Sequence, residues 1–135
     1  MQSEVIEIIK KVLVPKLNPE FMIVFGSYAK GYQREDSDID IAFYCQGESP
    51  SRYDTFLMAQ ELAEELKTEV DLIDLKTAST VFQAQIYITG KVIYCNNEER
   101  RMEEQMKAFS MYAKLNEERK SILDGIYKRG TIYEK

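Results

Sequence analysis

The chain has 135 residues, of which 23 are acidic and 18 are basic, so its net charge is −5 at pH 7. This length suits one ordinary domain. The acidic balance, without a dense Lys/Arg block, argues against a protein that grips extended nucleic acid through a basic face. An enzyme that touches one nucleotide or one RNA end remains compatible with it. Histidine is absent, which excludes histidine-based triads, histidine general bases and His-ligated zinc or haem.

No segment of the sequence is typical of secretion or of a membrane span. Glu and Lys residues interrupt the apolar positions of residues 1–15, and no later stretch is long and apolar enough to cross a bilayer. Cys45 and Cys95 lie far apart and form no Cys-x-x-Cys pair, so buried, reduced thiols are expected. These features predict a cytoplasmic protein.

The hydrophobic pattern predicts an alternation of helices and strands. Apolar residues at helical spacing predict helices over residues 3–13, 51–67, 78–89 and 97–129. Short apolar runs predict strands over residues 21–25, 38–45, 69–75 and 91–95. Residues 1–96 are expected to form the core, and residues 97–135 a helical extension of the same single domain.

The helix ends carry more specific signals. The first helix is expected to end near Pro15, because proline lacks the backbone N–H that continues a helix. Ser51 and Asn97 are expected N-caps, and the last helix is expected to end at 128–130, the sequence Lys-Arg-Gly. One helical turn is expected over residues 27–30. The second long helix is expected to bury one apolar face, formed by Phe56, Ala59, Leu62, Ala63 and Leu66.

The most informative segment is GSYAKG at residues 26–31, followed after a polar turn by DSDID at residues 36–40. A strand that ends in Gly-Ser before a helical turn offers free backbone N–H groups and a hydroxyl to phosphate oxygens. Asp38 and Asp40 are two residues apart on a strand and therefore point to the same face. Their carboxylates can share divalent cations, and such oxygen ligands select Mg²⁺ or Mn²⁺.

Each part of this pattern also has an ordinary structural interpretation. A lone Gly-Ser is usually a turn, and a lone Asp-x-Asp is usually a solvated or capping pair. The run of three aspartates is similar to the start of an EF-hand loop, but the sixth position is Ile41 instead of glycine and the twelfth is Gly47 instead of glutamate. The full order of strand, Gly-Ser, turn, Asp-x-Asp and strand is much rarer than its parts.

The motif GSYAKG…DSDIDIAFY, with the downstream VDLIDL and GKVIYC, resembles the DNA polymerase β-like nucleotidyltransferases and, in this compact form, the minimal nucleotidyltransferase (MNT) family. The likeness covers residues 4–95. It implies an α/β fold, with a small mixed sheet flanked by helices and a long C-terminal helix, that binds ATP with two Mg²⁺ ions, or Mn²⁺. Family members are the antitoxins of HEPN–MNT toxin–antitoxin pairs, and those studied most transfer AMP to a tyrosine of the HEPN toxin.

The resemblance assigns roles to the matching positions. Gly26 and Ser27 would hold the triphosphate, and Asp38 and Asp40 would bind the metal ions. Lys30 stands where the family often has a basic residue and would neutralise phosphate, although a solvated lysine is equally expected there.

The third carboxylate has two candidates. VDLIDL offers Asp71 and Asp74, which are three residues apart and so point to opposite faces of a strand. The family pattern places the acid after the first valine, so Asp71 is preferred as metal ligand and as acceptor of the proton from the incoming hydroxyl. Asp74 would then be a strand-end residue facing solvent.

Two readings of the C-terminal helix stay open. A helix of this length is longer than so small a domain is wide, and it carries apolar and aromatic residues that look exposed: Met111, Tyr112, Tyr127 and Tyr133. It either folds back onto the core or forms an arm that binds a partner.

Three functions remain in competition. The first is an adenylyltransferase that modifies a HEPN-type partner encoded nearby. The second is an antitoxin that neutralises that partner by binding alone. The third is an adenylyltransferase acting on a small molecule or an RNA end. The sequence leaves the acceptor, the base preference and the oligomeric state undecided.

Overall fold

The computed structural model describes residues 2–26 and 38–133. In chain order the elements are α1 (Gln2–Leu17), β1 (Phe21–Phe25), β2 (Ile39–Tyr44), α3 (Arg52–Leu66), β3 (Val70–Asp74), α4 (Thr80–Thr89), β4 (Lys91–Cys95) and α5 (Glu98–Tyr133). The predicted order of helices and strands is confirmed. The turn expected over residues 27–30 lies outside the described residues.

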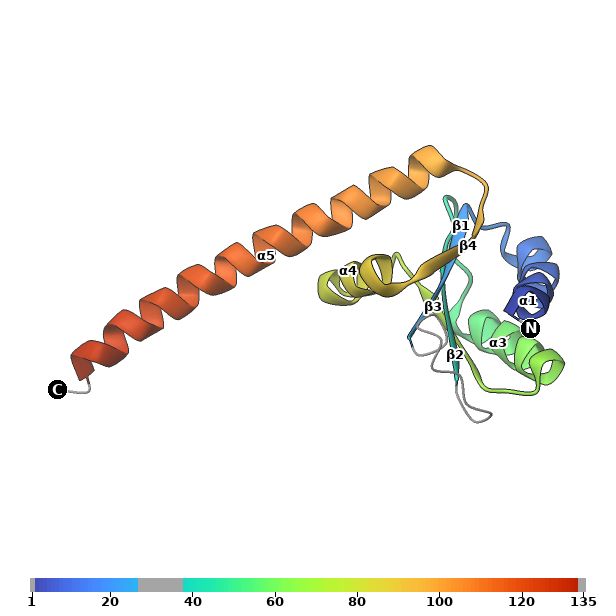
Figure 1. Cartoon of the computed structure of the whole chain (residues 1–135), viewed down its shortest axis with the longest axis horizontal. Coiled ribbons are helices and arrows are strands. Elements are labelled where there is room, and N and C mark those ends of the chain that lie inside the picture. The colour runs from blue at the N-terminus through green and yellow to red at the C-terminus, as the bar shows by residue number, and fades with distance from the viewer. Residues whose placement is uncertain (1, 27–37, 134–135) are drawn as a thin grey trace.

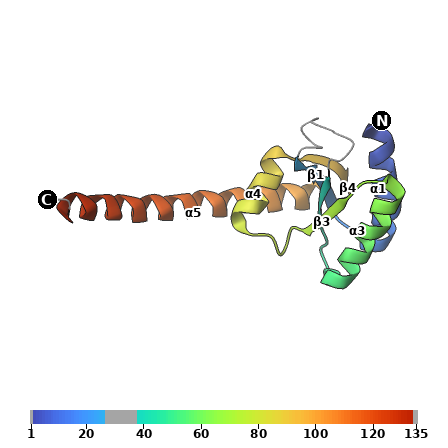
Figure 2. The same ribbon diagram turned by 90° about the horizontal axis from the view of Figure 1, so that it is seen from below.

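The four strands form one mixed sheet in the order β3-β2-β1-β4. β1 is antiparallel to both β2 and β4, whereas β2 and β3 are parallel. Helices α1 and α3 cover one face of the sheet, and α4 with the first part of α5 covers the other (Figure 1). The view from below shows the same two layers of helices (Figure 2). This is the predicted α/β fold with a small mixed sheet and a long C-terminal helix.

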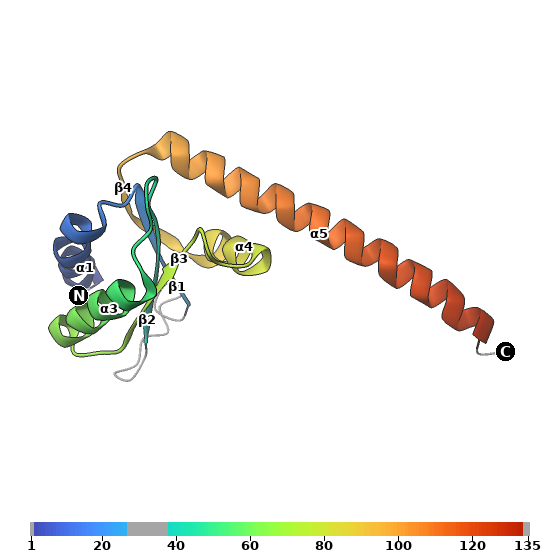
Figure 3. The ribbon, with the colours of Figure 1, turned by 180° about the vertical axis from the view of Figure 1, so that it is seen from behind.

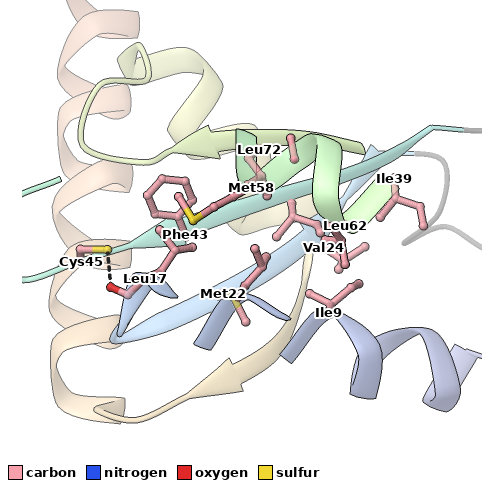
Figure 4. Packing of buried hydrophobic residues seen from close by; sticks show 13 residues of the cluster. Ile9, Leu17, Met22, Val24, Ile39, Phe43, Cys45, Met58, Leu62 and Leu72 are labelled. Carbon is pink, nitrogen blue, oxygen red and sulfur yellow. Dashed lines mark hydrogen bonds between the residues drawn. The ribbon is translucent and has the colours of Figure 1, made fainter. Parts of the chain in front are cut away.

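The core is divided between the two faces of the sheet. On the α1/α3 face, Ile9, Leu13 and Leu62 are fully buried against strand residues such as Phe43 (Figure 4). Each such side chain contributes about 1.5–3 kcal/mol by leaving water. On this face the Cys45 thiol donates to the Leu17 carbonyl oxygen at 3.5 Å. The opposite face has a smaller apolar cluster, formed by Phe21, Ile23, Phe25, Ala42, Leu75 and Ile86.

The predicted caps are confirmed. The Ser51 Oγ accepts from the Asp54 N–H at 3.0 Å, and the Asn97 Oδ1 accepts from the Arg100 N–H at 3.0 Å. Each bond satisfies a backbone donor that has no partner inside the first turn of its helix.

Both predicted helix ends were wrong. α1 continues past Pro15 to Leu17, because the proline lies in the last turn, where it removes a single hydrogen bond. α5 passes through Gly130 to Tyr133, since one glycine inside a helix costs only about 1 kcal/mol.

Two burial predictions also need correction. Phe56 is 57% exposed, and α3 instead buries Met58, Ala59 and Leu62. The helix is therefore rotated about its axis so that Phe56 lies over the open edge of the sheet. Both cysteines are free thiols, as predicted, but only Cys45 is buried, while Cys95 is half-buried.

The long helix α5 leaves the body of the protein. Its 36 residues span about 54 Å at 1.5 Å per residue. Phe109 packs edge-on against Tyr87 of α4, with ring centroids 6.3 Å apart, and the Arg100 guanidinium lies 3.7 Å from the Glu20 carboxylate. Beyond this region the helix projects away from the sheet and from every other element (Figures 1 and 3). Within the described residues, no helix is long and apolar enough to cross a membrane.

Candidate active site

The antiparallel pairing of β1 and β2 builds the first half of the site. Phe25, the last residue of β1, is paired with Asp40 of β2, so Gly26, which follows β1, lies next to Asp40. Gly26 has a φ of +75°, a conformation that favours glycine, and a Cβ there would lie 2.5 Å from the Asp40 Oδ2. Both the backbone conformation and the neighbouring carboxylate therefore favour glycine at this position. Ser27 and Lys30, the other predicted phosphate contacts, lie outside the described residues.

The parallel pairing of β2 and β3 adds a third carboxylate. Asp40 is the register partner of Asp71, so both side chains emerge from the same face of the sheet. Asp38 lies exposed two residues before Asp40, and alternation directs it to that face as well. The three aspartates singled out in the sequence are thus neighbours at one edge of one face.

Asp74 belongs to a different environment. It is paired with Phe43, whose side chain lies in the core on the α1/α3 face, opposite to Asp40. Its carboxylate oxygen Oδ1 accepts from the Lys76 N–H at 2.9 Å and so closes the turn after β3. Asp74 has a local structural role at the end of its strand.

The electrostatics of the aspartates reflect their proximity. Burial raises the pKa of the Asp40 carboxyl, and the neighbouring charges of Asp71 and then Asp38 raise it further. In the described part of the chain, no three acidic, thiol or imidazole side chains are gathered closely enough to hold an ion as they stand. A cation at this site would therefore require these carboxylates to move closer together.

A groove that the sequence did not predict lies beside Asp71. It has a volume of about 510 Å³ and runs between α3 and the outer edge of β3. Its lining is Pro50, Arg52, Thr55, Phe56, Ala59, Gln60, Val70, Asp71, Leu72, Ile73, Asp74 and Thr77. The α3 residues recur at helical spacing, but sequence alone could not show that this stripe faces an open sheet edge.

The sequence and the fold were compared with known proteins. The chain matches the family described as polymerase beta, nucleotidyltransferase, over residues 7–99. It is 36% identical over 113 residues to the protein adenylyltransferase MntA of Shewanella oneidensis, an alignment that covers 84% of this chain and 78% of that protein. A putative protein adenylyltransferase of Methanocaldococcus jannaschii is 38% identical over 79 residues, which cover 56% of this chain and 79% of that protein.

Two solved structures share the fold over nearly their whole length. Each has a TM-score of 0.75 and 33% identity, and each alignment covers 93% of this chain and 98% of the other. One is a toxin–antitoxin with AMP-PNP. The other is a tri-AMPylated HEPN toxin of Shewanella oneidensis in complex with an MNT antitoxin. The match over residues 7–99 takes in β1, β2 and β3 with their glycine and aspartates, and we conclude that the chain belongs to the polymerase beta nucleotidyltransferase family.

Proposed function

We propose that this protein is a protein adenylyltransferase that transfers AMP from ATP to a tyrosine hydroxyl of a HEPN-type partner and so acts as its antitoxin. The observation that carries the proposal is the register of Asp40 with Asp71 beside the close approach of Gly26. The similarity to MntA and to the solved toxin–antitoxin complexes supports a protein acceptor. We place the reaction in the cytoplasm, because ATP is available there and because reducing conditions there keep cysteines as free thiols, the state of Cys45 and Cys95.

Asp38, Asp40 and Asp71 are the groups that would hold Mg²⁺, or Mn²⁺, in this proposal. Carboxylate oxygens suit these hard cations. Burial, and then the neighbouring charges of Asp71 and Asp38, raise the pKa of the Asp40 carboxyl. One solved structure of the MntA complex carries glutamate in place of two aspartates separated by one residue, the spacing of Asp38 and Asp40. When bound, the ions would activate the acceptor hydroxyl and neutralise the triphosphate.

Different residues of the chain bind the triphosphate and accept the proton of the acceptor hydroxyl. Gly26 lets the backbone approach the triphosphate closely, and Ser27 and Lys30 would contact its oxygens. Asp71 takes the proton of the acceptor hydroxyl. The hydroxyl oxygen then bonds to the α-phosphorus, the bond from this phosphorus to the pyrophosphate oxygen breaks, and pyrophosphate leaves.

The distal half of α5 supplies the surface that holds the partner. Ile122 and Leu123 are 62% and 63% exposed. They lie in the part of α5 that projects away from all other described elements (Figure 3). The MNT antitoxin that aligns over 93% of this chain was solved in complex with its toxin. The division into a catalytic core, residues 1–96, and a helical extension, residues 97–135, is part of this proposal.

Mass spectrometry of a co-expressed HEPN partner tests the function directly. The partner should gain one or more AMP units when it is produced with the wild-type chain and none when it is produced with an Asp38→Asn, Asp40→Asn double variant. A partner that binds the wild-type chain tightly but stays unmodified would favour the alternative, an antitoxin that neutralises by binding alone.

A further inference from the structure

β3 forms one edge of the sheet, and the phase of its backbone hydrogen bonds is fixed at both ends. The Ile39 N–H donates to the Glu69 carbonyl at 2.9 Å, and the Leu75 N–H donates to the Phe43 carbonyl at 3.0 Å. In a parallel ladder, alternate residues of a strand bond to the same neighbour. The odd-numbered residues of 69–75 therefore direct their N–H and carbonyl groups to β2, and the even-numbered residues direct theirs outward.

The outward side of β3 is open and is bordered by the groove. Val70, Leu72 and Asp74 direct their backbone N–H groups to this side, and no described strand pairs with it. α3 forms the far wall of the groove, where Phe56 leaves 57% of its surface exposed next to Ala59. An exposed sheet edge with an apolar wall is a template for an added strand.

The groove lies on the α1/α3 face of the sheet, whereas Asp40 and Asp71 emerge on the opposite face, and the outer edge of β3 borders both. Neighbouring strands lie about 4.8 Å apart, and side chains at the same register emerge on the same face. A chain added to the outer edge of β3 would therefore place one side chain in a row with Asp71 and Asp40. A hydroxyl on that side chain would lie beside the group that takes its proton in the proposed mechanism.

The lining favours a polypeptide over other occupants. Of the residues that line the groove, Arg52 is the one basic side chain, against the two acids Asp71 and Asp74. An RNA end would require more positive charge than this. A compact small molecule would leave the row of outward backbone groups unused, whereas an extended peptide satisfies several of them at once.

We propose that this groove docks an extended segment of the protein acceptor, which adds to β3 as a further strand and places its hydroxyl-bearing side chain beside Asp71. The proposal rests on the protein adenylyltransferase function above. It names the surface by which the enzyme recognises its acceptor, and it assigns Phe56 as the side chain that packs on the docked segment.

Kinetics with a matched pair of variants tests the role of the groove. Phe56→Glu puts a negative charge on an exposed position of the groove wall, and Ile88→Glu makes the same change on α4, where the side chain is 63% exposed. With the HEPN partner as acceptor, Phe56→Glu should raise the KM for the partner about tenfold or more, through lost apolar contact. The affinity for ATP should stay unchanged, and Ile88→Glu should behave as wild type.

Amide hydrogen exchange tests the added strand itself. In a complex of the wild-type chain, the HEPN partner and a non-hydrolysable ATP analogue, the amides of Val70, Leu72 and Asp74 should exchange more slowly than in the free protein. Failure of the wild-type chain to transfer AMP would overturn the adenylyltransferase function and the groove proposal with it. Normal wild-type transfer, with an unchanged KM in Phe56→Glu or unprotected amides, would overturn the groove proposal alone.

Discussion

Replacing Gly26 with alanine should disturb the geometry of the site much more than the stability of the sheet. The residue has a φ of +75°, and an L-residue with a side chain pays about 1–2 kcal/mol in this left-handed region. Gly26 follows the last residue of β1, at the end of the strand. We therefore expect the free energy of unfolding to fall by about 1–2 kcal/mol, with the fold retained.

The effect on catalysis should be much larger. The added Cβ would lie 2.5 Å from the Asp40 Oδ2, and ordinary van der Waals contact begins at 3.4 Å. The carboxylate must therefore move by about 0.9 Å, the difference between these two distances. Displacing a group by about 1 Å at a reacting centre costs on the order of 100-fold in rate, so single-turnover AMP transfer should slow by about that factor.

Gly47→Ala provides the control. A Cβ at Gly47 meets nothing within 4 Å, so this variant should transfer AMP at the wild-type rate and unfold at the wild-type urea concentration. Urea unfolding and single-turnover transfer are measured on both variants. A Gly26→Ala protein that transfers AMP at full rate would show that the position of Asp40 does not limit the chemistry, and the site assignment would fail.

Three further predictions follow from the same geometry. Asp38→Asn combined with Asp40→Asn should abolish transfer and leave the unfolding free energy equal or higher, since repulsion among the carboxylates is relieved; an active double variant would contradict the metal assignment. Asp71→Ala should slow single-turnover transfer far more than Asp74→Ala, and the reverse order would exchange their roles. Truncation after Lys120, which removes Ile122 and Leu123, should weaken partner binding in calorimetry but spare ATP binding, and loss of both together with unfolding would make α5 part of the core.

The sequence was sufficient to locate the strands but not to pair them. β1 and β4 have the predicted bounds because each is a short apolar run closed or preceded by glycine. The face shared by Asp38 and Asp40 followed from alternation within one strand. The pairing of Asp40 with Asp71 depends on the register between two strands that a helix separates in the chain, and periodicity within either strand carries no information on it.

Burial on α3 was less predictable because it depends on where the sheet ends. Phe56 belongs to an apolar stripe and would be buried if a further strand lay beyond β3. The sheet stops at β3, so the aromatic ring faces the groove instead. The incorrect prediction for Phe56 and the proposed docking surface have the same origin. The apolar pattern of α3 predicts that Phe56 is buried, but the side chain lies at a sheet edge where this chain supplies no further strand.

The arm and the groove lie on opposite sides of the sheet and should contribute to acceptor binding in different ways. An arm that holds the body of the partner keeps its acceptor segment near the site at an effective concentration in the millimolar range, while the groove orients that segment at Asp71. Truncation of the arm and Phe56→Glu should then each raise the KM for the partner. Because the two surfaces share no residue, their fold-increases should multiply in the combined variant. If the KM of the combined variant instead equals that of the single variant with the higher KM, the partner uses one surface only. The proposed separation of tethering from orientation would then be wrong.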